Sequence, residues 1–411
     1  MKLVFLRALG GLIVLLASQC VGLDWPRWRG PDLNGISKET DWTLAWPKEG
    51  PKQLWKANVG MGFSSMTVGQ GRVYTMGNKD DQDTVYCFDA ASGEEIWKHT
   101  YKEPLNPHYH EGGTTGTPTV DGETVYTLSR KGNIFAFERA TGKVQWSKNI
   151  ATELDLAVPE WGFSGSPLVE GELLILNTGT QGAAINKKTG AAVWSTGKKA
   201  SGYSTPVPFE TKGRRAVMLF GAQHLAAIEV KSGKEIWTFP WKTSYDVNAA
   251  DPIILGEKIF ISSGYRTGGA LLTVASGRPT VVWKNQNMHN QFNTCVLIKD
   301  HLYGTSGQNG HAGDLRCVDF NTGEVKWKEG SAGLGALMAA DGKLIVLGEK
   351  GELIIAEATP EKFKPLARAQ VLGGTCWTTP VLSNGRIYCR NAHGALVCVD
   401  VSTKALASER R

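Results

Sequence analysis

One short phrase recurs six times along this chain: an acidic or polar residue, then Ser/Thr-Gly, then a Trp a few residues later. The Trp of each copy follows that of the previous copy after 43 to 49 residues, and Trp55 stands one further period ahead of the first copy. A period of this length is typical of structural units that stack on one another, so it predicts a repeat architecture. The six copies span residues 89–97, 138–146, 186–194, 229–237, 273–283 and 319–327.

Each repeat unit is predicted to form four short β-strands. In the second unit, apolar and β-branched runs alternate with turn residues such as Asp121-Gly122 and Thr141-Gly142. We expect the Gly of each Ser/Thr-Gly pair to adopt a positive φ in a hairpin bulge, and the preceding polar side chains to bond nearby backbone amides. No long window has a helical apolar period, so we expect few helices. The four runs are residues 117–120, 124–128, 134–137 and 144–146.

A four-stranded sheet of this size cannot bury both of its faces alone. Such sheets can stack around an axis as the blades of an all-β propeller, whose ring protects most strand edges. The Trp of each fourth strand is then predicted to fill the gap to the neighbouring blade. A small residue recurs two positions before the phrase in most units, as interdigitated packing requires. The predicted blade-docking residues are Trp55, Trp97, Trp146, Trp194, Trp237, Trp283 and Trp327, and the small residues are Cys87, Ala136, Ala184, Ala227, Cys317 and Cys398.

The opening strands of the units provide an independent count of the blades. Their aligned positions number eight, so we expect an eight-bladed propeller of four-stranded antiparallel blades, with seven blades as the main alternative. The last unit has no good fourth strand after Lys404, whereas Gln53-Leu-Trp55-Lys56 has the pattern of a fourth strand with no unit before it. We therefore predict that the N-terminal strand closes the ring. The aligned positions are Met66, Pro118, Pro167, Pro206, Pro252, Cys295, Met338 and Pro380.

The first 22 residues have the pattern of a signal peptide. Lys2 and Arg7 form a basic start, and residues 9–17 form an apolar core that is too short for an ordinary spanning helix. Gln19 and Ala17 fit a lipoprotein signal poorly, so we do not expect lipid attachment at Cys20. The chain is therefore predicted to be exported to the periplasm or the extracellular space, and not to span a membrane.

Beyond the signal, we expect three segments: a Trp/Pro-rich strap over residues 23–51, the propeller over residues 52–404 and a tail over residues 405–411. The strap contains four Trp residues, which predicts that it packs across the propeller. Without residues 1–22 the formal net charge falls from +6 to +4. Spread over a chain of this length, that charge points to no nucleic-acid partner.

Six cysteines remain after the signal, and an even number in an exported chain invites a disulfide interpretation. Three of them, Cys87, Cys317 and Cys398, occupy the repeat position where other units have Ala, which favours a role as small core residues. A single bridge among Cys376, Cys389 and Cys398 in the last unit is the alternative, and we do not expect it.

Strand order indicates where a binding site would lie. The short turns after the first and third strands share one face, whereas the long, varied links from each fourth strand to the next first strand lie on the opposite face, where function usually sits. Residues just before the first strands should therefore rim the central funnel, and their mixture of aromatic, amide and carboxylate groups suits a flat or sugar-like ligand. These candidates are Phe63, Glu111, Trp161, Phe163, Tyr203, Asp246, Asn248, Asn290, Phe292, Asn293 and Trp377.

His108-Tyr109-His110-Glu111 is the densest polar cluster in the sequence. His residues two apart on a strand face the same way, as a metal pair would, which makes His108 and His110 weak metal candidates. No third ligand is evident nearby, and a loop rich in Pro and Gly explains the histidines equally well. No nucleophile motif in a strand-turn-helix context appears, so no catalytic residue is assigned.

The phrases at residues 89–97 and 319–327 resemble the repeat of the pyrroloquinoline-quinone (PQQ) propeller superfamily, and the resemblance covers residues 52–404. It implies the fold of the quinoprotein alcohol dehydrogenases. The opening segment, residues 24–35, also resembles the start of many exported PQQ-repeat proteins of unknown role.

The resemblance implies two functional classes. Quinoprotein dehydrogenases hold PQQ and Ca²⁺ in the funnel under an adjacent Cys-Cys disulfide, with a catalytic Asp and Glu/Asn metal ligands. This chain has no Cys-Cys pair and no Cys-x-x-Cys-His haem site, and it is short for those enzymes. Other members, such as the propeller of the outer-membrane β-barrel assembly machinery, bind proteins through their rim and loops.

We therefore expect a non-catalytic binding or scaffold protein of the cell envelope, monomeric and without a cofactor. Its partner would be an envelope protein or a polysaccharide. One alternative is a PQQ- and Ca²⁺-dependent alcohol or sugar dehydrogenase, and a second is a carbohydrate-binding propeller.

Overall fold

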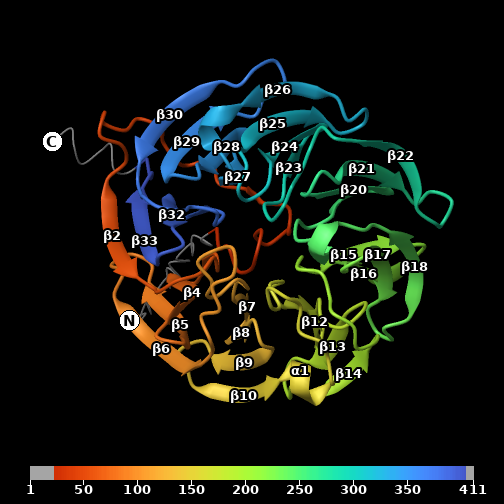
Figure 1. Cartoon of the computed structure of the whole chain (residues 1–411). Coiled ribbons are helices and arrows are strands. Elements are labelled where there is room, and N and C mark those ends of the chain that lie inside the picture. Colours follow the sequence, from red (N-terminus) through yellow and green to blue (C-terminus); the bar gives the residue numbers. More distant parts are fainter. Residues whose placement is uncertain (1–22, 404–411) are drawn as a thin grey trace, which may run out of the picture.

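The computed structural model describes residues 23–403, which form eight four-stranded antiparallel sheets arranged as a ring (Figure 1). This confirms the eight-bladed prediction over the seven-bladed alternative. The predicted signal peptide, residues 1–22, lies outside the described residues. Seven of the eight aligned positions come directly before a first strand, and Met338 lies inside one.

The first four blades follow one another along the chain, and within each blade the chain runs from the innermost strand to the outermost strand. Blade 1 is β3 (Thr67–Gly69), β4 (Arg72–Lys79), β5 (Gln82–Asp89) and β6 (Glu95–Lys102). Blade 2 is β7 (Thr119–Asp121), β8 (Thr124–Leu128), β9 (Asn133–Glu138) and β10 (Val144–Asn149). Blade 3 is β11 (Leu168–Glu170), β12 (Leu173–Leu176), β13 (Ala183–Asn186) and β14 (Ala192–Ser195). Blade 4 is β15 (Val207–Thr211), β16 (Arg214–Phe220), β17 (His224–Glu229) and β18 (Glu235–Pro240).

The remaining blades complete the ring, and the last of them takes its fourth strand from the N-terminal part of the chain. Blade 5 is β19 (Ile253–Leu255), β20 (Lys258–Ser263), β21 (Gly268–Thr273) and β22 (Thr280–Asn285). Blade 6 is β23 (Val296–Ile298), β24 (His301–Ser306), β25 (Asp314–Asp319) and β26 (Val325–Glu329). Blade 7 is β27 (Ala336–Ala340), β28 (Lys343–Leu347), β29 (Glu352–Glu357) and β30 (Pro365–Gln370). Blade 8 is β31 (Val381–Ser383), β32 (Arg386–Arg390), β33 (Ala395–Asp400) and β2 (Gln53–Asn58).

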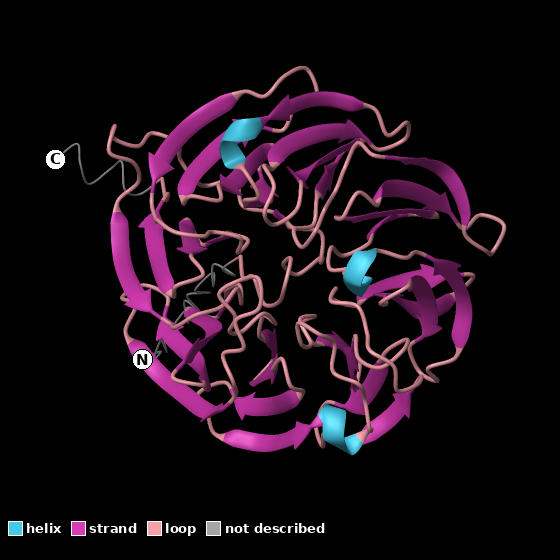
Figure 2. Cartoon of the chain, viewed as in Figure 1, coloured by secondary structure: helices cyan, strands magenta, loops and turns pink. Residues whose placement is uncertain are grey.

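Helical structure is scarce, as expected from the lack of a helical apolar period. Within residues 23–403 it consists of α1 (Ile150–Glu153) and the 3-10 turns η1 (Ser244–Asp246) and η2 (Gly330–Ala332), which stand out between the strands in Figure 2. None of the helices in this part of the chain has the length and apolar character needed to cross a bilayer.

The ring closes through β2, as predicted from Trp55, a fourth-strand Trp with no repeat unit before it. β2 pairs antiparallel with β33, and Trp55 lies opposite Cys398 in the register (Figure 1). The N-terminal segment makes one further strand, β1 (Ile36–Ser37), which pairs parallel with β27 and gives blade 7 a fifth strand. Backbone hydrogen bonds therefore hold the N-terminal part of the chain to the last two blades.

The repeated Trp residues join successive blades. The indole N–H of Trp97, for example, donates to the carbonyl of Arg139 in the next blade at 3.0 Å. The Gly of the next repeat packs against the same ring: Gly142 has a φ of +72°, and a Cβ there would lie 2.5 Å from the Trp97 indole. The small residue lies directly across the hairpin, since Cys87 pairs with Trp97. Trp, Gly and small residue thus form one packing unit.

The fifth unit departs from this pattern. Its phrase is two residues longer, and the residue opposite Trp283 is Leu271 instead of a small one. A Cβ on Gly277 of this unit would meet Lys212 and not the Trp of the previous blade. Consistently, Trp237 is a docking Trp whose indole N–H has no partner among the described residues.

Residues 23–51 cross the propeller on the face of the short turns. Trp25 bridges to Val68 in blade 1, and the carbonyl of Pro26 accepts from an amide of blade 2. Farther along, Glu39 accepts the amides of Asn384 and Gly385 in blade 8. The strap also reaches the opposite side of the ring, because the indole N–H of Trp28 donates to Asp251 just before blade 5.

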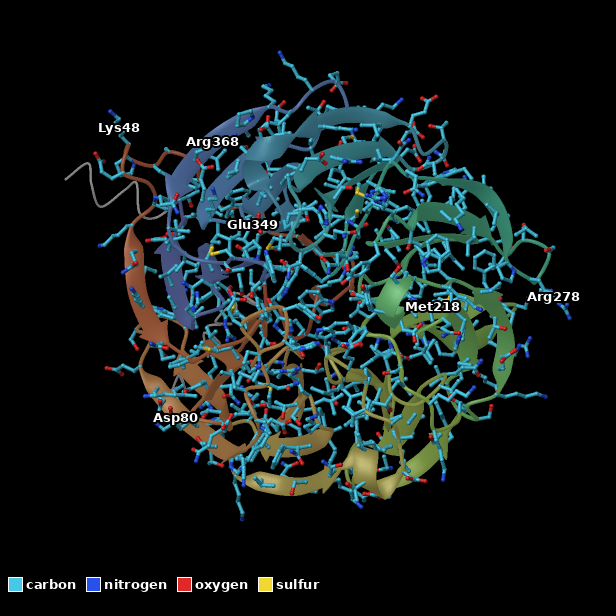
Figure 3. All side chains as sticks on the ribbon, in the orientation of Figure 1. Lys48, Asp80, Met218, Arg278, Glu349 and Arg368 are labelled. Carbon is cyan, nitrogen blue, oxygen red and sulfur yellow. The ribbon has the colours of Figure 1, made fainter. Side chains whose placement is uncertain are left out.

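The interior is built from small and apolar side chains. All six cysteines of the described part are buried and free of disulfide bonds, so they act as small core residues, and the bridge within the last unit is not formed. Charged side chains such as Arg278 and Arg368 project from the periphery, whereas Met218 lies within a blade (Figure 3).

Candidate functional site

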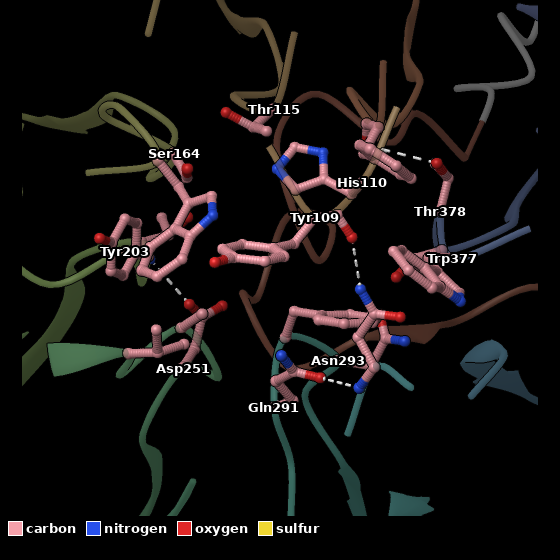
Figure 4. A pocket seen from close by; sticks show the side chains of 18 of the residues that line it. Tyr109, His110, Thr115, Ser164, Tyr203, Asp251, Gln291, Asn293, Trp377 and Thr378 are labelled. Atoms are coloured by element: carbon pink, nitrogen blue, oxygen red, sulfur yellow. Dashed lines mark hydrogen bonds between the residues drawn. The ribbon is translucent and has the colours of Figure 1, made fainter. Parts of the chain in front are cut away.

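The funnel face opens into a cavity of about 640 Å³. This volume lies within the range of roughly 300–1,000 Å³ that is typical of ligand sites. The cavity wall comes from the segments that precede the first strands of most blades, together with two turns between second and third strands. Figure 4 shows these side chains converging on one space.

Aromatic rings cover much of this wall. Trp377 stacks on Phe63 with 5.5 Å between ring centroids and 19° between planes, and Phe292 packs on Trp377 at 4.8 Å. On another part of the wall, Trp161 makes edge contacts with Tyr203 and Tyr245. The two groups of rings come from blades that are far apart in the sequence, so the ring closure is what brings them to one cavity.

Three tyrosines of the mouth have left-handed backbone conformations. Tyr109, Tyr245 and Tyr265 have φ values of 61°, 62° and 54°. Such values are uncommon for bulky residues, and they often mark sites where the surrounding structure fixes a side chain for a purpose. Tyr109 and Tyr245 are 80% and 67% exposed. The backbone thus holds two large aromatic side chains in solvent at the edge of the cavity.

The strap forms the part of the cavity wall nearest to the face of the short turns. Trp28 lines the cavity, and its indole N–H donates to Asp251 at 2.6 Å. Arg29, which is buried, lies 3.9 Å from the same carboxylate oxygen and donates to the carbonyls of Asn34 and Cys295. Burial raises the pKa of Asp251, and the neighbouring Arg29 opposes this shift. Asp251 therefore fastens the strap to blade 5.

A ladder of side-chain oxygens runs around the channel below the rings. In blades 1 to 5, a backbone amide just before the first strand donates to the equivalent side chain of the next blade, at distances of 2.8 to 3.0 Å. Asp251 is the acid in a ladder that otherwise uses hydroxyl groups. The ladder runs from Ser65 through Thr117, Ser166, Thr205 and Asp251 to Thr294.

The remaining titratable groups lie near the mouth. Glu160 is exposed and lies 3.1 Å from Nε2 of His108. Burial lowers the pKa of His110 to about 4, so this imidazole is neutral at pH 7, and its ring meets the edge of Phe63. Arg130 donates to the carbonyls of Trp161 and Leu105 and thereby ties together two loops of the rim.

The cavity brings together six of the eleven residues that the sequence proposes for the rim. The others lie elsewhere. Glu111 faces His393, Phe163 is buried in the core beside blade 3, and Asp246 accepts from Gln223. Asn248 and Asn290 are buried and donate their side-chain amide N–H groups to backbone carbonyls. The six on the wall are Phe63, Trp161, Tyr203, Phe292, Asn293 and Trp377.

The two metal candidates do not form a pair on a strand. His108 and His110 lie in a loop that turns at Tyr109, where φ is positive, so His108 contacts Trp161 and His110 contacts Phe63. No group of three or more His, Cys, Asp or Glu side chains within residues 23–403 has the arrangement of a metal site.

Several wall residues do not appear among the sequence candidates. Tyr265 and Asn309 belong to turns between second and third strands, which in an antiparallel blade lie on the same face as the long links. That alternation is readable from the strand order and would have found them. Trp28 and Asp251 come together only through the path of the strap, for which the sequence contains no signal.

Fold and cavity define a β-propeller with an aromatic funnel on its loop face. A family model described as "Outer membrane protein assembly factor BamB" matches residues 42–196 and 81–329. The chain therefore belongs to this family of PQQ-repeat propellers. Among curated proteins, no sequence matches this chain significantly.

Solved structures share the fold at low sequence identity. BamB from Moraxella catarrhalis superposes with a TM-score of 0.64 at 15% identity, covering 85% of this chain and 99% of that one. Quinohemoprotein alcohol dehydrogenase from Comamonas testosteroni has a TM-score of 0.66 at 14% identity, covering 92% and 80%. A europium-containing methanol dehydrogenase has a TM-score of 0.66 at 13% identity, covering 92% and 89%. Similarity at this level reflects the shared propeller.

Proposed function

We propose that this chain is a non-catalytic binding propeller of the cell envelope, and that it binds through its funnel face. The observation that carries the proposal is the chemistry of the cavity wall, which offers aromatic faces, hydroxyls and amides at a rigid concave surface. The signal peptide predicted at residues 1–22 and the match to the family model of an outer-membrane assembly factor support a place in the envelope.

The wall does not fit PQQ, the cofactor of the dehydrogenases that share this fold. PQQ is a flat polycarboxylate, so a site for it must supply cations or a metal ion to balance its charge. The charged side chains on this wall are the acids Glu160 and Asp251, and His110 is neutral at pH 7. No group of three or more His, Cys, Asp or Glu side chains within residues 23–403 is arranged to hold a metal ion, so an anionic quinone here would face carboxylates without a cation to balance them.

Asp251 does not fit the part of a catalytic base. One of its oxygens accepts from Trp28 and lies beside Arg29, and the other accepts the backbone amide of Thr205 at 2.8 Å. A base must have a lone pair aimed at the proton that it removes. This carboxylate is instead occupied in holding the strap, which favours binding over catalysis.

A dye-reduction assay tests the proposal. The protein is mixed with PQQ, Ca²⁺, a panel of alcohols and aldoses, and a dye acceptor, and the initial rate of dye reduction is measured. We expect the rate of dye reduction to equal that of a control sample without protein. PQQ-dependent reduction that falls in Trp161→Ala and persists in Asp246→Ala would contradict the proposal, because Trp161 lines the cavity whereas Asp246 lies outside its wall.

A further inference from the structure

We propose that the funnel cavity binds a neutral oligosaccharide. This inference rests on the proposed function and names the ligand class of the same site. A sugar ring presents apolar C–H faces and a rim of hydroxyls that both donate and accept hydrogen bonds. A site for such a ligand needs exposed aromatic faces, donors and acceptors together, and little charge.

The aromatic faces are present on opposite walls. In Figure 4, Tyr203 and Trp377 stand at opposite sides of the cavity, with Tyr109 between them. Trp161 and Trp377 are half-buried, so each indole is fixed by its neighbours on one part of its surface and remains open on another. Rings held in this way offer stacking surfaces that need no reorganisation when a ligand arrives.

Hydrogen-bond donors are left over on the same wall. The hydroxyl oxygens of Thr117, Ser166 and Thr205 each accept one backbone amide in the ladder. A hydroxyl that accepts keeps its own proton for donation. No side-chain or backbone acceptor within residues 23–403 takes these three protons, and all three residues line the cavity. A ligand rich in oxygen atoms can accept them.

An acceptor accompanies these donors. Asn293 donates its amide N–H groups to the carbonyls of Leu334 and Gly335, and its side-chain oxygen has no donor among the described residues. The side-chain amides of Gln291 and Asn309 also line the cavity. Donors and acceptors on one wall are what sugar hydroxyls require. A cation held by the rings would have no use for hydrogen-bond donors on the wall, so this mixture favours a saccharide.

A chain of hydrogen bonds holds the mouth in shape. Nδ2 of Asn309 donates to the carbonyl of Tyr109 at 2.8 Å and so connects the loop before blade 2 with a turn of blade 6. The backbone amide of Asn309 donates to Oε1 of Gln291, and Nε2 of Gln291 donates to the hydroxyl of Tyr265 at 3.0 Å. The backbone at Tyr109 and the half-buried ring of Tyr265 are thereby held at the mouth of the cavity, where successive rings of a saccharide chain would pass.

The test is isothermal titration calorimetry of the protein with five neutral hexasaccharides: maltohexaose, cellohexaose, xylohexaose, mannohexaose and N-acetylchitohexaose. We expect saturable binding of at least one of them. Loss of one stacking face should weaken that binding about tenfold or more in Trp161→Ala and in Tyr245→Ala. Tyr245 is largely exposed, so its variant should fold even if Trp161→Ala does not. Trp46→Ala, which removes a half-buried Trp outside the cavity, should leave the binding unchanged.

The possible outcomes separate this inference from the proposed function. If no hexasaccharide binds, or if binding is equal in all variants, the ligand class is wrong and the binding role can still stand. Saturable binding of tetramethylammonium that is lost in Tyr245→Ala, with no hexasaccharide bound, would also overturn the ligand class. If chromatography shows that a bound hexasaccharide is cleaved, the ligand class is correct and the non-catalytic role is wrong.

Discussion

Replacing Arg29 with Met removes the cation that faces Asp251 and tests whether this buried pair fastens the strap to the propeller. Both side chains are almost fully buried, at 6% and 4% exposure. Removing one member of a buried pair leaves the other charge without compensation and typically costs about 3–5 kcal/mol. Trp28 and the amide of Thr205 still donate to Asp251, so we expect the lower part of this range, about 3 kcal/mol at pH 7.

The loss should depend on pH. Burial raises the pKa of Asp251, and Arg29 opposes this shift, so the pKa in the folded state should rise further in Arg29→Met. A folded-state pKa above the unfolded value means that the folded protein holds the proton more tightly, and its stability falls as pH rises through the folded pKa. The deficit of Arg29→Met relative to the natural chain should therefore be small at pH 3 and larger at pH 7.

The assay is urea unfolding at 25 °C, followed by Trp fluorescence at both pH values. Lys38→Met is the matched control, because Lys38 and Asp32 form an exposed pair in the same strap, and surface pairs contribute about 0–1 kcal/mol. Arg29→Met combined with Asp251→Asn should recover part of the loss, since no uncompensated charge remains. A loss below about 1 kcal/mol for Arg29→Met at pH 7, or an equal loss at both pH values, would show that this buried pair does not fasten the strap.

Three further perturbations test the packing of the blades. Gly142→Ala should destabilise the protein more than Gly122→Ala in equilibrium unfolding. Both positions have a positive φ, which alone costs about 1–2 kcal/mol, but only a Cβ at Gly142 would collide with Trp97. Equal losses would contradict the proposed packing unit. Trp55→Ala should lose about 3–5 kcal/mol of unfolding free energy, since the buried ring closes the propeller, and a loss below about 1 kcal/mol would contradict this role. Burial raises the pKa of Asp83 to about 7, so the folded state favours its protonated form and stability should fall as pH rises through 7. Asp83→Asn should flatten that pH dependence in thermal unfolding, whereas an unchanged profile would assign it to another group.

The architecture could be predicted from the sequence because the packing unit is local and repeated. Residues equivalent to Trp97, Cys87 and Gly142 recur in most units, and they make the same contact in each. Even the ring closure was readable, since Trp55 is a fourth-strand Trp without a unit of its own. Such a pattern survives departures in single copies, as blade 5 shows with Leu271 opposite its Trp.

The cavity could be predicted only in part. Most of its residues lie just before a first strand, but no recurring residue type marks them. Large aromatics before first strands, such as Trp161 and Trp377, reached the wall as expected. Asn248 and Asn290 occupy similar positions but bind backbone carbonyls. The sequence does not distinguish an Asn that satisfies the backbone from one that contacts a ligand. The contact of Arg29 with Asp251 joins residues from opposite parts of the chain, which no local spacing can reveal.

If the funnel binds a neutral ligand, it should not bind a quinone. We would titrate the protein calorimetrically with PQQ in the presence of Ca²⁺ at pH 7, because the wall offers carboxylates where this anionic cofactor needs a cation. We expect no saturable heat. Saturable binding of PQQ that disappears in Trp161→Ala and persists in Trp46→Ala would contradict it.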